Sequence, residues 1–194
     1  LAALKLMAED TGAELLVQRI QYKNPTSIMP REVRSAWYDE ELRPYLFGHR
    51  VRLCKNLEIM GDIPIQPTAE SPLVGLGTVT GAHSAIIGHP KLELECIPTP
   101  QQSLPKVFTT TGAVTHQNYV RSKAGKRGEF HHTFGACYVE VVGDLFYLFQ
   151  INADEDGSFY HLNKRYLADG KTIETAGEDR PFVEAISLGD EHCE

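Results

Sequence analysis

The sequence lacks several features that would each indicate a particular class of protein. It has no apolar run near the roughly 20 residues that span a bilayer and no charged-then-apolar amino-terminal signal. It contains no internal repeat and no low-complexity tract. Its four cysteines show no C-x-x-C spacing, which argues against a zinc ribbon or a thioredoxin-type pair; they are Cys54, Cys96, Cys137 and Cys193. We therefore expect a soluble protein with reduced cysteines.

Positive charge is also scarce. The 194 residues include 19 Lys and Arg against 26 Asp and Glu, a formal net charge of −7. That balance argues against binding nucleic acid by bulk electrostatics, because counterion release needs clustered cations. The exception is local, since Arg121, Lys123, Lys126 and Arg127 lie within seven residues. The hydrophobic content of 42% is ordinary for a globular protein with one substantial core.

The hydrophobic pattern predicts an α/β fold with a mixed, mostly buried sheet sandwiched with helices. A helix at 1–11, ended by Gly12, precedes a strand at 14–20, and a second helical pattern covers 31–47. Polar loops are expected at 22–30, 61–68 and 168–180. Further strands are predicted at 53–60, 84–89, 92–97, 107–111, 158–162 and 182–188, and the clearest hairpin pairs 134–142 with 145–151 around Gly143-Asp144.

Both ends look cut, because Leu1 already lies within a helical pattern and the last residues directly follow an apolar segment. We expect a piece of a longer polypeptide. An α/β accessory or core domain would span 1–183. A strand and a first metal motif at 184–194 would lead into a domain beyond the chain.

The segment from Thr109 to His132 combines hydroxyls, cations and imidazoles with several glycines. Lys123, Lys126 and Arg127, with Asn118, could contact phosphate oxygens, while the glycines let a backbone approach closely. The alternative is a solvated loop whose charges favour solubility.

Histidines provide further candidates. His89 follows a short strand in the sequence Gly-His, a position from which an imidazole can project into a cleft. His131 and His132 are adjacent and would point to opposite faces of extended chain, so one of them is expected in the core. We take His89 and His132 as candidate catalytic groups.

Asp190 and His192 form the sharpest pair. They alternate after the apolar segment Ala185–Leu188, so an extended backbone directs both side chains to one side, where an oxygen and a nitrogen could hold one divalent ion. The acidic turn 154–156 lacks the ligand pattern of a calcium loop. Cys137 lies within a predicted strand and is expected to be an inert thiol.

Four blocks of sequence carry a resemblance to a known family: 22–27, 61–69, 86–92, and 111–112 through 134–136. Together they resemble the middle region of large phage-encoded proteins that are similar to calcineurin-like metallophosphoesterases, including pre-early siphophage proteins that act on host DNA. The first metal motif of that superfamily is Asp-x-His after a strand, which Asp190 and His192 match. The resemblance implies Mn or Mg, DNA as a partner, and action in the host cytoplasm.

Three hypotheses follow. The first is part of a metal-dependent phosphodiesterase or nuclease with metal near Asp190 and His192. The second is a non-catalytic module that docks nucleic acid or a partner chain, including a second copy, through its basic segment. The third, an amidase-like hydrolase, rests only on fold-level analogy.

Overall fold

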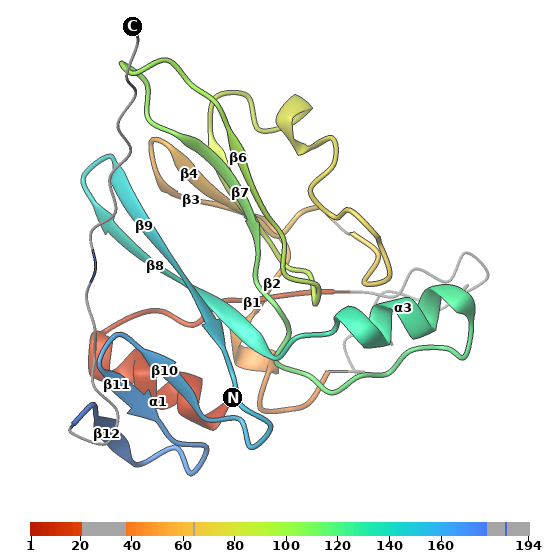
Figure 1. Ribbon diagram of the computed structural model, residues 1–194, viewed down its shortest axis with the longest axis vertical. Helices are drawn as coiled ribbons and strands as arrows, with labels where there is room; N and C mark the ends of the chain where they lie inside the picture. Colours follow the sequence, from red (N-terminus) through yellow and green to blue (C-terminus); the bar gives the residue numbers. More distant parts are fainter. Residues whose placement is uncertain (21–37, 64, 178–184, 186–194) are drawn as a thin grey trace, which may run out of the picture.

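A computed structural model describes residues 1–20, 38–63, 65–177 and 185 (Figure 1). These residues form a mixed α/β structure, as the hydrophobic pattern predicted. The helices are α1 (Ala2–Thr11), α3 (Lys123–His131) and the 3-10 turns η1 (Arg43–Tyr45) and η2 (Leu76–Thr78). The strands are β1 (Val17–Gln18), β2 (Leu46–Phe47), β3 (Arg50–Cys54), β4 (Leu57–Met60), β5 (Ser84–Ile87), β6 (Leu94–Ile97), β7 (Lys106–Thr110), β8 (Gly135–Val142), β9 (Leu145–Asn152), β10 (Phe159–His161), β11 (Lys164–Tyr166) and β12 (Ile173–Thr175).

The largest sheet has five strands in the order β3-β4-β5-β7-β6. Its three inner strands, β4, β5 and β7, run parallel, and the two edge strands run antiparallel to their neighbours. The inner strands β4 and β5 are buried throughout, as expected for parallel strands covered on both faces. The single strand predicted at 53–60 is wrong, because Lys55 and Asn56 form a turn between β3 and β4.

The two faces of this sheet carry separate apolar clusters. Met60, Leu73 and Phe108 belong to the first, which is closed by the long 61–83 connection that contains η2. Ile59 and Ile86 belong to the second, against which side chains of the β8–β9 hairpin pack. In the described part of the chain, a loop and a hairpin thus cover the sheet, where helices on its faces were expected.

Helix α1 belongs to a third cluster. Its buried residues Ala3 and Met7 pack with Ile151 of β9 and with Phe159 and Tyr166 of the three-stranded sheet β10-β11-β12. Gly12 ends the helix in a left-handed conformation with φ 72°, as predicted.

Several predicted elements differ from those observed. The strand expected at 14–20 is reduced to β1, which pairs in parallel with β2. The polar loop expected at 168–180 contains β12. The β8–β9 hairpin is confirmed, with eight residue pairs between its strands. The predicted strands at β5, β6, β7 and β10 are also confirmed. The helix predicted at 31–47 lies partly outside the described residues. In the described part the prediction is wrong, because the short turn η1 begins at Arg43, with Pro44 next, and strand β2 follows it. Apart from Ala185, the last predicted strand, 182–188, and the segment 184–194 lie outside the described residues.

Candidate functional site

The carboxyl ends of three parallel strands lie at one edge of the five-stranded sheet, where open α/β sheets usually place their sites. The segments that follow these strands contact one another. The backbone N–H of Gly112 donates to the carbonyl of His89 at 2.9 Å, and that of Thr133 donates to Pro90 at 3.0 Å. Three of the four blocks that carried the family resemblance, 61–69, 86–92 and 111–136, therefore meet here, and 22–27 lies outside the described residues.

His89 is fully buried at this edge. The backbone N–H of Lys91 donates to its Nδ1 at 3.1 Å, which leaves Nε2 as the protonated nitrogen, donating to the carbonyl of Gln66 at 3.0 Å. Burial lowers the pKa of His89, so the neutral ring is favoured. In this geometry neither ring nitrogen is open to a substrate, and the residue joins two loops. The predicted catalytic role of His89 draws no support from these contacts.

The basic segment forms helix α3, which corrects the prediction of a loop. Ser122 begins it, because its hydroxyl accepts a hydrogen bond from the backbone N–H of Gly125 at 3.0 Å. Each of its two glycines costs about 1 kcal/mol relative to alanine, so packing against the rest of the chain has to offset them in a helix this short. Figure 1 shows α3 at one side of the molecule, beyond the start of β8.

The glycines of α3 have a packing role. Gly125 and Gly128 are buried one turn apart on the same helix face. A Cβ atom at Gly125 would overlap the carbonyl oxygen of Val120, and one at Gly128 would lie 2.9 Å from the ring of Tyr119 and 3.0 Å from the methyl of Thr68. The glycines were predicted to let the backbone approach a ligand closely. In the structure they instead let α3 pack closely against other residues of the same chain.

The opposite face of α3 is exposed and basic. Arg127 donates to the carboxylate of Glu70 at 2.6 Å. Within the part of the chain that the structure describes, the side chains of Arg121, Lys123 and Lys126 form no ion pair. We call Lys123, Lys126 and Arg127 of α3, together with Arg121 just before the helix, the cationic face.

Glu70 connects the helix to the sheet edge. Its carboxylate binds Arg127, and its backbone carbonyl accepts a hydrogen bond from the Lys91 ammonium. Lys91 also pairs with Glu93 at 2.9 Å. The Arg127–Glu70 pair thus links α3 to the loop after β4, in which the carbonyl of Gln66 accepts a hydrogen bond from His89. Sequence reasoning missed Glu70, because nothing in the chain order links it to residue 127.

His132, the other candidate catalytic group, follows directly after α3 and is half-buried. Its Nδ1 lies 2.8 Å from the hydroxyl of Tyr119, and its Nε2 lies 2.8 Å from the carbonyl of Thr115. Burial lowers its pKa, so the neutral ring is favoured and Tyr119 donates to it. His132 holds the segment before α3 in place, and Asn118, next to Tyr119, is exposed. A contact of either with substrate stays a prediction.

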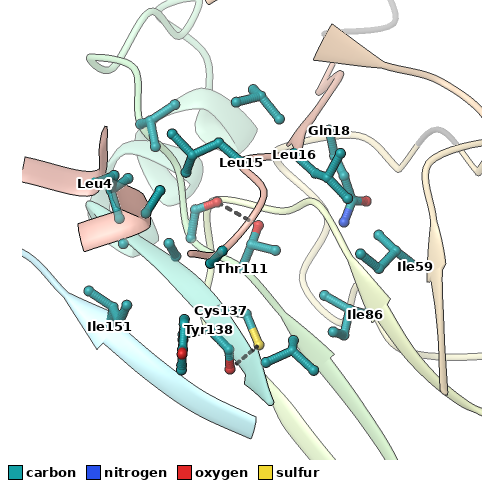
Figure 2. A pocket seen from close by; sticks show the side chains of 18 of the residues that line it. Leu4, Leu15, Leu16, Gln18, Ile59, Ile86, Thr111, Cys137, Tyr138 and Ile151 are labelled. Atoms are coloured by element: carbon teal, nitrogen blue, oxygen red, sulfur yellow. Dashed lines mark hydrogen bonds between the residues drawn. The ribbon is translucent and has the colours of Figure 1, made fainter. Parts of the chain in front are cut away.

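A cavity of about 370 Å³ lies between the amino-terminal segment, the sheet and the β8–β9 hairpin. Figure 2 shows its largely aliphatic walls, including Leu4, Leu16 and Ile86, with Thr111 and Cys137 among the few polar groups. Burial raises the pKa of Cys137 to about 12, which supports the prediction of an inert thiol. Among the described residues, the lining of this cavity includes no Lys or Arg side chain.

The predicted metal ligands Asp190 and His192 lie outside the described residues. Among the residues that are described, no group of three or more His, Cys, Asp or Glu side chains is arranged to hold a metal ion. Cys54, Cys96 and Cys137 are free thiols, as expected. Metal binding near residue 190 therefore stays a prediction from the sequence.

Comparison with known proteins finds one curated relative. The chain is 32% identical over 200 residues to Protein A1 of Escherichia phage T5, an alignment that covers 100% of this chain and 35% of that protein. The chain thus spans about a third of its relative's length. No protein-family model and no solved structure matches it. In the described residues, no helix has the length and apolar character needed to cross a membrane. The similarity to Protein A1 supports a phage origin for this chain.

Proposed function

We propose that this chain binds DNA through the cationic face of α3, as a module of a phage protein that acts during infection. The observation that carries the proposal is the group of exposed cations Arg121, Lys123 and Lys126, which have no acidic partner among the described residues. Lys123 and Lys126 lie on a helix whose inner face packs closely against its own chain at Gly125 and Gly128. A preorganised cationic surface loses less side-chain and loop freedom when it binds.

The acidity of the whole chain sharpens this proposal. With a net charge of −7, most of the surface repels a polyanion, so binding is expected to depend on a region where cations are concentrated. Each phosphate neutralised on duplex DNA contributes about 0.9 to the slope of log affinity against log salt concentration. Three contacts predict a slope of about −2.7.

The test compares two triple variants of the chain. Arg121→Ala, Lys123→Ala and Lys126→Ala together remove the three cations of the cationic face that form no ion pair among the described residues. Arg19→Ala, Lys55→Ala and Lys171→Ala together remove the same charge from exposed positions elsewhere. Affinity for a labelled DNA duplex is measured by fluorescence anisotropy over a range of salt concentrations.

We expect the first variant to lose affinity and most of the salt slope, and the second to lose little of either. Binding should persist in a metal chelator, because no step of it uses a metal. Equal losses in both variants would show that only net charge matters and would contradict a site on α3.

A second candidate function, metal-dependent cleavage of DNA, is favoured by the Asp-x-His spacing of Asp190 and His192. An Mn or Mg ion held there would activate a water and neutralise phosphodiester charge. On this proposal α3 delivers DNA to a centre that needs further ligands, from a domain beyond this chain or from another subunit, and it acts in the host cytoplasm.

The phosphodiesterase proposal is tested by elemental analysis and nuclease assay of a chain that includes any following domain. Asp190→Ala should remove bound metal and activity together, whereas Asp144→Ala, at the exposed β8–β9 turn, should leave both intact. Retention of metal and activity by the Asp190 variant excludes this centre. That result would leave the binding role of α3 standing.

A further inference from the structure

An exposed aromatic ring lies beside the cationic face. Phe130 is 82% exposed, more than any other large hydrophobic side chain in the described part of the chain. His131 contacts it in a T-shaped arrangement, with ring centroids 5.0 Å apart. A phenyl ring left in water on a well-formed helix buries apolar area only when something covers it.

Helix geometry places this ring among the cations. At 3.6 residues per turn, Lys123, Lys126, Arg127 and Phe130 lie within about 100° of arc, on the side opposite Gly125 and Gly128. Phe130 is about 10 Å along the axis from Lys123. Glu129, the one carboxylate of the helix, lies on its flank. The outward face therefore presents cations followed by one aromatic ring.

We infer that α3 binds single-stranded DNA, with Phe130 stacked on an unpaired base while Lys123 and Lys126 contact the phosphates. Aromatic side chains beside a cationic surface are how proteins bind single strands without reading sequence, because every base has a π face. In a duplex those faces are covered by neighbouring base pairs, so only a strand with unstacked bases can use the ring. This inference rests on the proposed function and names the form of DNA that it favours.

The charge pattern favours DNA over a protein as the occupant. The side chains that share the exposed face of α3 with Phe130 are Lys123, Lys126 and Arg127, so the ring has no apolar rim on this helix. Protein interfaces instead place an aromatic anchor in a desolvated apolar centre and deplete lysine there. A polyanion with stacking bases fits both the cations and the ring.

The experiment compares a labelled oligonucleotide with the duplex of the same sequence at one salt concentration. Phe130→Ala should weaken binding of the single strand about 5- to 150-fold, the range for loss of one stacked base, and leave duplex binding little changed. Phe130→Trp should retain the preference for single strands. Phe130→Leu keeps apolar area without a π face and should behave like the alanine variant. Tyr147→Ala, an aromatic 51% exposed on β9, serves as the matched control and should have no effect.

The outcomes separate this inference from the proposed function. If Phe130→Ala lowers the affinity for single strand and duplex equally, or if Phe130→Leu keeps full affinity for the single strand, Phe130 does not stack on a base. Either result would overturn the inference and leave DNA binding itself intact. If Phe130→Ala changes sedimentation of the protein and not its DNA affinity, the ring serves contact between copies, which also overturns the inference. If neither form of DNA binds in a salt-dependent way, the proposed function itself fails.

Discussion

Substitution of Gly125 by alanine tests the packing on which the DNA-binding surface depends. Alanine is normally the better helix former by about 1 kcal/mol, so propensity alone predicts a more stable protein. Space predicts the reverse, because the new Cβ would overlap the carbonyl oxygen of Val120. A backbone atom cannot rotate away as a side chain can, so α3 or the segment before it must move.

The magnitude follows from the two opposing terms. Forcing an extra carbon into a packed contact costs about 1 to 3 kcal/mol, and a backbone clash belongs at the upper end. We expect Gly125→Ala to lower the free energy of unfolding by about 2 kcal/mol after its propensity gain is included. Gly128→Ala should cost less, because its closest neighbours are the side chains of Tyr119 and Thr68, at 2.9 and 3.0 Å.

Thermal unfolding followed by circular dichroism tests whether Gly125→Ala destabilises the protein more than Gly128→Ala does. For a chain of this size, 1 kcal/mol corresponds to a shift in Tm of about 2 to 4 °C. Gly77→Ala is the control, since a Cβ there meets nothing within 4 Å and its φ is ordinary. DNA affinity should fall in the Gly125 variant and stay unchanged in the Gly77 variant. A Gly125 variant as stable as the parent protein, with unaltered DNA binding, would refute the packing argument.

Three further predictions concern the contacts around α3. Because the pKa of His89 is lowered in the folded protein, the unfolded chain takes up a proton at a higher pH than the folded one. The stability that the neutral His89 contributes is therefore present above about pH 6.5 and is lost as the pH falls below that value. His89→Gln should reduce this acid sensitivity in denaturant unfolding curves measured from pH 7 to pH 5. Glu70→Gln frees Arg127 and should raise DNA affinity and steepen its salt dependence, and an unchanged slope would show that Arg127 does not reach phosphate. Tyr119→Phe removes the hydroxyl that donates to His132 and should lower the free energy of unfolding by about 1 kcal/mol, measured by chemical denaturation.

Elements with strong local signals could be predicted from the sequence. Helix α1 has a helical pattern and a terminal glycine, and the β8–β9 hairpin alternates around Gly143-Asp144, so local preference and tertiary structure agree in both. Helix α3 was not predicted, because glycines such as Gly125 and Gly128 are typical of loops and turns. The Ser122 cap three residues before Gly125 was the signal that could have identified the helix. Once the helix is known, its periodicity places Phe130 beside Lys123.

Composition and chain order alone determine where the cations are concentrated, that the rest of the protein is acidic, and which segments alternate as strands, because these are properties of neighbouring residues. Only the tertiary structure decides that Glu70 neutralises Arg127, that Gln66 and Lys91 occupy both nitrogens of His89, and that the glycines of α3 face the protein. The physical reason is distance along the chain. Each of these contacts is fixed by how parallel strands and their connections pack, and residues far apart in sequence carry no local signal of a shared position in space.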